Sequence, residues 1–439
     1  MANYLSMTRA EQEAMLAAVG AKNVTELYRD VPSALLAKPL NIPSGVSQQE
    51  TAERMEAMAK RNTVFDVVLR GAGSYRRYIP SVVGALSKRS EFLTAYTPYQ
   101  AEMSQGILQS IFEYQTMIAR LTGTDVANAS VYSGASAAAE GVLMTADRNR
   151  NVVIVATAIR PDVKEVLRTY TEGRGVTLKF LPLKDGRCDS DALREAADKT
   201  TAAIYAEQPD FYGMIEDLAA IGAIAKEVGA KFVVGLDPAM GAILKAPGAC
   251  GADIVVGEAQ TLGLPTAFGG LQLGFMACKQ KEMRKLPGRI VGETVDAEGN
   301  RAYVLTLQAR EQHIRRDKAS SNICSNQAHC ALTAAIYMAA MGPQGMREVA
   351  TASASLAHYF ARLLTDIPGI SMAYGGEFLQ EFVTVANGKS EAVLKALAKE
   401  GILGGLPLDG DRILWCCTET VRKEDLDRAA AIIRRAVCD

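Results

Sequence analysis

The sequence predicts an α/β protein in three parts: an N-terminal helical arm, a large domain built on a mostly parallel, doubly wound sheet, and a smaller C-terminal α+β domain. Short β-rich runs alternate with helical stretches through the middle of the chain, helix-start signals recur near its beginning, and the pattern changes after Gly342-Pro343. A chain of 439 residues is long enough for two or three packed units. We predict boundaries at residues 1–90, 91–340 and 341–439.

Residues 1–90 carry two helix-start signatures. Thr8 with Glu11, and Ser47 with Glu50, each place a hydroxyl three residues ahead of a carboxylate. The stretch between residues 32 and 43 holds three prolines, and residues before proline avoid helical angles. The sequence therefore predicts two helices joined by an extended segment. An arm of this kind often packs on another subunit.

The large domain is predicted from its periodicity. Apolar residues recur at helical spacing from Ser104 to Leu121, and a second helix begins near Ser133. The β-rich runs that follow are Val152–Ala156, Thr177–Leu181, Ala202–Ala206, Lys231–Leu236 and Ile254–Val256. Helices over Thr306–Ala319 and Asn326–Met341 complete this domain. In the smaller domain we predict a long helix, strands at 380–385 and 412–418, and helices at 391–400 and 424–437.

Composition excludes several classes of function. The 48 basic and 49 acidic residues leave a formal charge of −1, so no positive field attracts nucleic acid or anionic lipid. No window approaches 18 uninterrupted apolar residues, and the first residues do not form a secretory signal. Eight cysteines without a C-x-x-C pair, and three histidines, predict no metal site. Reduced, buried thiols favour a cytoplasmic location.

The first candidate site is the polar segment 94–106, which precedes a helix. Loops on rigid elements concentrate binding groups, and a helix start offers free N–H groups to an anion. The segment is equally compatible with a polar loop and an ordinary helix start. Its candidate residues are Tyr96, Thr97, Tyr99, Gln100, Glu102, Ser104 and Gln105.

Two further candidates lie in the predicted sheet region. Ser133, Gly134 and Ser136 begin a helix with small side chains, which allow backbone amides to approach a phosphate but also allow close helix packing. Asp237 ends a hydrophobic strand, and open α/β sheets bind ligands at the carboxyl ends of their strands. A turn carboxylate ahead of Pro238 is an equal alternative for this acid.

The distribution of lysines is also informative. No lysine occurs between Lys245 and Lys279, although the segment around Gln260 and Thr261 has the strand-then-turn character of a cofactor-binding element. This segment cannot form a Schiff base. The glycine-rich run 268–274 fits a turn into a strand, and no nucleophile elbow, Walker loop or G-x-G-x-x-G fingerprint is present.

At these motifs the chain resembles a known family, glycine dehydrogenase (decarboxylating) subunit 1, the α half of the P protein of the glycine cleavage system. The resemblance covers nearly the whole chain. It is carried by long strings, among them GAGSYRRYIP, RSEFLTAYTPYQAEMSQG, FEYQTMIARLTGTDVANAS, GADIVVGEAQTLG and GRIVGETVDAEGNRAYVLTLQAREQHIRRDKASSNIC.

The resemblance implies a pyridoxal-phosphate fold-type-I architecture, like that of aspartate aminotransferase. It also implies an α2β2 heterotetramer with glycine decarboxylase subunit 2, the β chain, which supplies the lysine and holds pyridoxal phosphate. This oxidoreductase would decarboxylate glycine and pass the aminomethyl group to the lipoyl arm of the H protein. Candidate residues of segment 94–106 would then approach a composite pocket, where Glu102 accepts a proton or holds the loop.

By the fold-type-I pattern, Asp237 predicts a lysine near Gln260 or Thr261, and neither residue can replace it. The resemblance therefore implies that Ser133, Gly134, Ser136, Asp237, Gln260 and Thr261 are remnants of a cofactor pocket. Two alternatives stay open. One is a stand-alone fold-type-I lyase that uses Lys245 or Lys279, and the other is a non-catalytic scaffold or glycine-sensing binding subunit.

Overall fold

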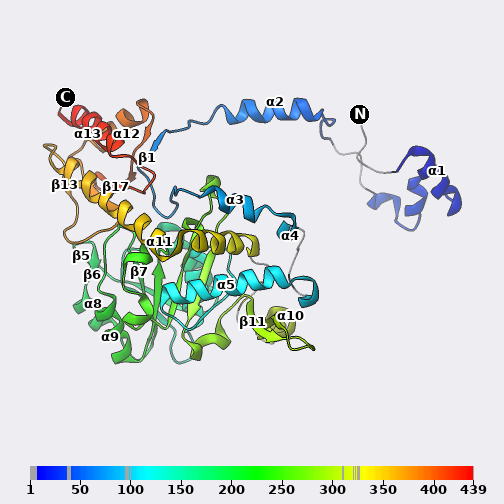
Figure 1. Ribbon diagram of the computed structural model, residues 1–439, viewed down its shortest axis with the longest axis horizontal. Helices are drawn as coiled ribbons and strands as arrows, with labels where there is room; N and C mark the ends of the chain where they lie inside the picture. Colours follow the sequence, from blue (N-terminus) through cyan, green and yellow to red (C-terminus); the bar gives the residue numbers. More distant parts are fainter. Residues whose placement is uncertain are drawn as a thin grey trace. The chain divides into compact units, whose positions relative to one another are not determined.

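A computed structural model describes residues 7–36, 41–93, 98, 100–308, 311–319, 321, 323 and 327–438 (Figure 1). The chain separates into two compact units, residues 1–64 and residues 65–439. The arm and domain boundaries predicted at residues 90 and 340 stay predictions. In the described part of the chain, every helix is too short or too polar to cross a membrane.

The first unit consists of short helices that begin where the sequence predicts. α1 (Arg9–Ala18) starts with a complete capping box between Thr8 and Glu11. In α2 (Gln48–Ala59), the Ser47 hydroxyl accepts a hydrogen bond from the backbone N–H of Glu50. Between them lie the 3-10 turns η1 (Val24–Tyr28) and η2 (Ser33–Leu35). None of the described residues of this unit is buried, so its helices share no core.

The second unit is organised around a sheet whose described strands have the order β2-β10-β9-β8-β7-β3-β4. Strands β9, β8, β7, β3 and β4 run parallel to one another, and β10 is antiparallel to both of its neighbours. The strands are β2 (Val126–Ala127), β3 (Val152–Val155), β4 (Thr177–Phe180), β7 (Thr201–Gln208), β8 (Lys231–Leu236), β9 (Ile254–Glu258) and β10 (Gly274–Cys278). The predicted α/β class with a mostly parallel sheet is confirmed.

Helices cover both faces of this sheet, because successive strand residues point to opposite sides. Val153 and Val155 of β3 face the core beneath α6 and α7, whereas Ile154 faces the core beneath the helices of the other layer. Figure 1 shows α5 and α11 running side by side over this second face, as their packing contacts require. The helices are α5 (Gln105–Thr122), α6 (Gly134–Leu143), α7 (Pro161–Glu172), α8 (Ser190–Ala196) and α9 (Leu218–Val228).

The kinked helix α11 (Ala328–Thr365) leads from the large sheet to the C-terminal elements. Gly342 (φ 63°, ψ 178°) interrupts it, in a backbone conformation that favours glycine, and Pro343 follows. An antiparallel sheet of order β13-β14-β17-β16 then packs its buried Trp415 and Phe382 against Phe360 of α11. The elements are β13 (Ser371–Met372), β14 (Glu381–Val385), α12 (Ser390–Lys399), β15 (Ile402–Leu403), β16 (Leu406–Leu408), β17 (Arg412–Cys416) and α13 (Lys423–Cys438).

Shorter elements complete the second unit. β1 (Val67–Val68) pairs in parallel with β15, so the start of this unit lies beside its C-terminal part. α3 (Ser81–Ser87) packs on α11. The remaining pieces include α4 (Ser90–Leu93), η3 (Ala101–Met103), β5 (Leu183–Lys184), β6 (Arg187–Cys188), η4 (Met240–Ile243), η5 (Pro247–Cys250), η6 (Ala259–Thr261), η7 (Ala267–Gly269) and η8 (Gln280–Lys285).

The helix predicted over Thr306–Ala319 is wrong. β11 (Ile290–Val295) and β12 (Arg301–Thr306) form a hairpin that ends at Thr306, and Leu307 then turns the chain with a positive φ of 55°. After it the described residues form only the short α10 (Gln312–Arg315) and η10 (Arg316–Lys318). Charges spread around this segment leave it no apolar face to bury, so its helical spacing does not produce a long helix.

Candidate functional site

A cavity of about 60 Å³ lies at the carboxyl ends of the parallel strands. Asp210 follows β7, Asp237 follows β8 directly, Glu258 ends β9, and Arg160 precedes α7. This edge is where open α/β sheets bind ligands. The cavity wall also includes Gly73, Tyr75, Gly134, Tyr205, Glu207, Thr261 and Glu381. Carboxylates therefore dominate its polar lining.

The predicted small-residue helix start lies at this cavity. Ser133 is the N-cap of α6, and its hydroxyl accepts a hydrogen bond from the Ser136 backbone N–H at 3.2 Å. Gly134, the first residue of α6, lines the cavity and is buried. A Cβ atom at Gly134 would lie 2.7 Å from the Glu258 Cβ, so this position requires glycine.

Glu258 fills the space in front of the α6 start. Its Oε2 accepts a hydrogen bond from the Gly134 backbone N–H at 2.8 Å. Its Oε1 accepts two more, from the backbone N–H groups of Leu273 at 2.7 Å and Gln260 at 3.0 Å. Burial raises the pKa of this carboxyl, while the bonds from Leu273 and Gly134 oppose that rise. The helix start that could hold a phosphate thus holds a carboxylate of this chain.

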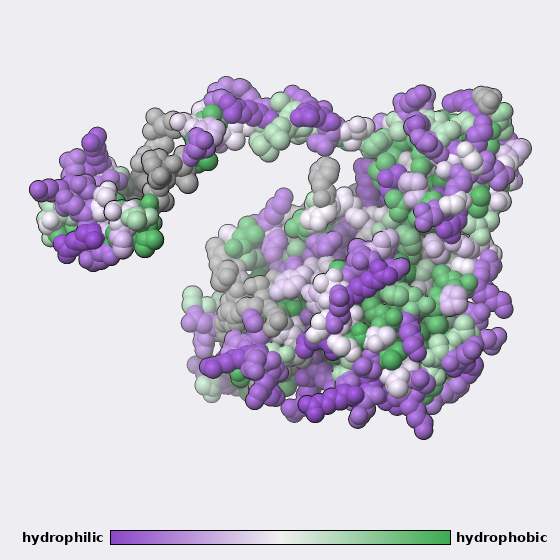
Figure 2. All heavy atoms as spheres, turned by 180° about the vertical axis from the view of Figure 1, so that it is seen from behind, coloured by the Kyte–Doolittle hydropathy of each residue, from purple (hydrophilic) through white to green (hydrophobic). Residues whose placement is uncertain are grey.

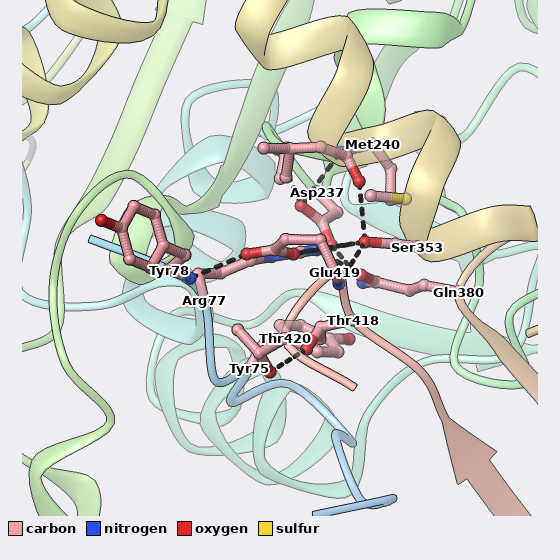
Figure 3. A network of polar contacts seen from close by, with 12 residues as sticks. Tyr75, Arg77, Tyr78, Asp237, Met240, Ser353, Gln380, Thr418, Glu419 and Thr420 are labelled. Atoms are coloured by element: carbon pink, nitrogen blue, oxygen red, sulfur yellow. Dashed lines mark hydrogen bonds and ion pairs between the residues drawn. The ribbon is translucent and has the colours of Figure 1, made fainter. Parts of the chain in front are cut away.

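Asp237 is also held by side chains and backbone of this chain. Its Oδ2 accepts a hydrogen bond from Gln380 Nε2 at 2.7 Å, and its Oδ1 accepts one from the Ala239 N–H at 2.9 Å. Gln380 in turn accepts a bond from the fully buried Arg77, whose guanidinium pairs with Glu419 at 2.7 Å. Figure 3 shows these side chains converging from separate elements. Asp237 is therefore both a turn carboxylate and a member of a buried polar network.

Gln260 and Thr261, where the fold pattern predicts a lysine, have different surroundings. Gln260 is buried. Its Oε1 accepts a hydrogen bond from the Tyr75 N–H, and its Nε2 donates to the Tyr75 carbonyl and to the Leu264 carbonyl, the latter at 2.7 Å. Thr261 is 2 % exposed, and its hydroxyl has no hydrogen-bond partner among the described residues. Gly134, Asp237 and Thr261 thus line one cavity, and Gln260 is buried next to Thr261.

Two other buried carboxyls in the cavity wall have strongly shifted pKa values. Burial raises the pKa of Glu207 to about 7 and that of Glu381 to about 7. Glu381 accepts hydrogen bonds from the Tyr75 hydroxyl and the Ala72 N–H, both at 2.7 Å. These groups were not found by sequence reasoning, because nothing local marks a buried acid. Glu258 stands two residues before Gln260, so its position in the motif was visible although its role was not.

The polar segment 94–106 does not contribute to the cavity wall through its described residues. Tyr96, Thr97 and Tyr99 lie outside the described residues. Gln100 and Glu102 are exposed, and Ser104 precedes α5 without a side-chain cap bond. Gln105 exchanges hydrogen bonds with the backbone of Tyr303 in β12, both at 2.8 Å.

Pyridoxal phosphate does not fit the cavity. A volume of about 60 Å³ accommodates a few water molecules and not a phosphorylated pyridine ring. The lining includes no lysine, and Glu258 and Gln380 already occupy the helix start and Asp237. Lys245 is exposed, and Lys279 bonds the Gly251 carbonyl away from the cavity. No described cluster of His, Cys, Asp or Glu could hold a metal ion.

Comparison with known proteins places this arrangement in a family. Residues 2–433 match the glycine cleavage system P-protein family. The chain belongs to that family. Among relatives of this P-protein chain, the "Probable glycine dehydrogenase (decarboxylating) subunit 1" of Desulforamulus reducens is 47 % identical over 98 % of both chains. The protein of the same name from Thermotoga maritima is 44 % identical over 97 % of this chain and 98 % of its own.

Solved structures agree with this family and its fold. The P-protein chain is similar to a crystal structure of glycine decarboxylase (P-protein) in inhibitor-bound form, with a TM-score of 0.94, 42 % identity, and coverage of 99 % of this chain and 100 % of that chain. A sphingosine-1-phosphate lyase from Burkholderia pseudomallei shares the fold alone, with a TM-score of 0.66, 15 % identity, and coverage of 92 % and 94 %. The fold-type-I architecture implied by the sequence resemblance is confirmed.

Proposed function

We propose that this P-protein chain is the cofactor-free subunit of a two-subunit glycine decarboxylase. The observation that carries the proposal is the cavity without a lysine, in a chain closely similar to relatives called subunit 1. Its partner, subunit 2, supplies the lysine and holds pyridoxal phosphate, in an α2β2 assembly. Together they decarboxylate glycine and transfer the aminomethyl group to the lipoyl arm of the H protein.

An exposed apolar surface between residues 78 and 103 supports a partner. Tyr78, Val82 and Leu86 are spaced four residues apart and exposed, while Val83 of α3 points into the core. Leu93 and Met103 are exposed as well, and Met103 is 82 % exposed. A run of exposed large apolar side chains marks an interaction surface. Leu93 directly precedes the polar segment 94–106 and Met103 lies within it, so a partner that covers these two residues would meet that segment.

The first unit supports an assembly as well. Its helices have ten and twelve residues, and isolated helices of this length are marginal in water. Figure 2 shows hydrophobic residues at its surface among hydrophilic ones. The exposed ones include Met15, Val19, Leu27, Tyr28, Leu35, Ile42, Met55 and Met58. We propose that this arm packs on another subunit, which would supply the core that it lacks.

The chemical contribution of this chain is to complete a shared pocket. Tyr96, Thr97, Tyr99, Gln100 and Ser104 supply hydroxyl and amide groups that can bind a carboxylate or phosphate. Glu102 is an exposed carboxylate that accepts a proton or orders the segment. Gln105 is a positioning residue, because its amide ties the start of α5 to β12.

The experiment is exchange of the glycine carboxyl group with labelled bicarbonate, in the presence of pyridoxal phosphate and lipoylated H protein. We expect exchange when this chain is mixed with its lysine-bearing homologue and none from this chain alone. Exchange by the chain alone would contradict the proposal and favour a stand-alone enzyme. Exchange by the homologue alone at the full rate would reduce this chain to a scaffold or glycine-sensing subunit.

A substitution tests whether Glu102 belongs to the shared pocket. Glu102→Gln removes the charge of the exposed carboxylate without changing its shape, and we expect a loss of at least about tenfold in the exchange rate of the assembled enzyme. Glu113→Gln, on the exposed side of α5, is the matched control and should leave the rate unchanged. Equal rates for the two variants would remove Glu102 from the pocket.

A further inference from the structure

The start of α6 has the groups of an anion-binding site, and they converge on one carboxylate. The backbone N–H groups of Gly134, Gln260 and Leu273 come from three places in the chain and donate to Glu258 at 2.8, 3.0 and 2.7 Å. Backbone N–H groups at a helix start, together with the positive end of the helix dipole, favour a negative charge. These donors are satisfied inside the chain, and an outside anion would have to displace Glu258.

Glu258 is not a surface group that happens to lie near a helix. Glu258 is partly buried, its burial raises the pKa of its carboxyl, and ionised carboxylates are costly to bury unless several donors compensate them. Three N–H groups and the nearby positive charge of Arg160 provide that compensation. The close approach of Glu258 to Gly134, where a Cβ would collide, shows that the sequence has made room for it.

A second acid of the cavity wall, Asp237, is also held by side chains of this chain. Asp237 is bonded to Gln380, which is bonded to Arg77, so its carboxylate is not free to meet a ligand. Glu207 and Glu381 add further carboxyls to the wall, which disfavour a second anion. Both the α6 start and Asp237 are therefore paired with groups of this chain.

We propose that Glu258 is a built-in substitute for an external anion: it occupies the anion-binding start of α6 and thereby keeps inorganic phosphate and phosphorylated cofactors out of this chain. The proposal goes beyond the proposed function, because it concerns this chain by itself and holds whatever its partner does. It makes the loss of cofactor binding a result of an added carboxylate as well as of a missing lysine.

The test is binding of inorganic phosphate to the full chain, measured by calorimetry and by the shift in Tm at constant ionic strength. Glu258→Ser removes the carboxylate and leaves the three N–H groups open. We expect this variant to bind phosphate at least about tenfold more tightly than the wild type, since hydrogen bonds to a charged group are strong. Phosphate should raise its Tm and leave that of the wild type unchanged.

Two matched variants make the result specific. Glu258→Gln keeps the shape of the Glu258 side chain at the start of α6 without its charge, and it should exclude phosphate as the wild type does. Glu207→Gln removes a carboxyl from the same cavity but leaves Glu258 in place, and it should also bind no phosphate.

Three outcomes would overturn the proposal. The first is a folded Glu258→Ser chain that binds no phosphate. The second is equal phosphate binding by Glu207→Gln, which would show a general effect of charge. The third is a Glu258→Ser chain that does not fold even in phosphate buffer, because an outside anion should be able to replace the carboxylate.

Discussion

The polar cavity and the surface between residues 78 and 103 differ in how far this chain satisfies its own groups. In the cavity, Glu258 and Asp237 bond partners within the chain, whereas the Thr261 hydroxyl and Asp210 Oδ2 are buried without a partner among the described residues. On the surface, Tyr78 and Met103 expose large apolar areas that no described part of the chain covers. Two carboxylates of the cavity are thus held within the chain, and the exposed apolar side chains lie outside its lining.

Paired polar groups in an interior and exposed apolar side chains on a surface have different physical consequences. A pocket that binds a ligand leaves polar groups open or strained, whereas a fully paired interior mainly stabilises a fold. An exposed apolar surface has the opposite meaning, because its burial requires a second molecule. The hydrogen bonds of Glu258 and Asp237 therefore mainly stabilise the fold, and under the proposed function this chain would contribute to activity at its surface.

The largest expected effect comes from breaking the buried network at Arg77. Arg77→Met leaves Glu419 and Gln380 without their partner, and loss of one member of a buried ion pair costs about 3–5 kcal/mol. Urea denaturation of the full chain measures the change. The control is Arg194→Met, whose pair with Glu227 is exposed and contributes at most about 1 kcal/mol. Similar losses for both would mean that the network does not stabilise the core.

The second effect is a pH dependence of stability caused by Glu381. Burial raises the pKa of this carboxyl from its usual 4.5 to about 7 in the folded chain. The folded state therefore holds the proton more tightly than the unfolded state. This contribution to stability is fully present below pH 4.5 and is lost as the pH rises through about 7. The expected size is on the order of 3 kcal/mol.

Glu381→Gln should remove that dependence. We expect the variant to gain stability relative to the wild type as the pH rises from 4.5 to about 7, the interval between the usual pKa of the carboxyl and its pKa in the folded chain. Urea midpoints across this range provide the measurement. Glu391→Gln is the control, because Glu391 is exposed on α12 and its pKa is lowered by Lys395. A parallel pH profile for Glu381→Gln and the wild type would contradict the buried, proton-holding state of Glu381.

Much of the fold was predictable, because its signals are local. The strand β3 is a buried run of β-branched residues, β8 is mostly buried and apolar, and α6 begins at a serine cap that the sequence displays. The hairpin β11–β12 was missed, because its register depends on packing against α5 and not on its own pattern. The helix predicted over Thr306–Ala319 does not form, because helical spacing without a buried apolar face does not make a helix.

The candidate site was predicted only in part. Gly134, Asp237 and Thr261 were found because helix starts and strand ends meet at one edge of a parallel sheet. What fills that edge was not predictable, since the bonds of Glu258 to Gly134 and of Gln380 to Asp237 join residues more than a hundred positions apart. The assignment of segment 94–106 to a shared pocket stays a prediction.

The smallest effect is expected at the exposed apolar residues between 78 and 103. Met103→Glu places a charge on the exposed apolar surface, and we expect about tenfold weaker association with the lysine-bearing partner, equivalent to about 1.4 kcal/mol. Val295→Glu, on the exposed end of β11, is the matched control and should leave association unchanged. Both variants should unfold like the wild type, because neither side chain is buried. Equal association constants for Met103→Glu and Val295→Glu would show that the partner binds elsewhere. The exposed apolar residues between 78 and 103 would then have to be covered by a different molecule.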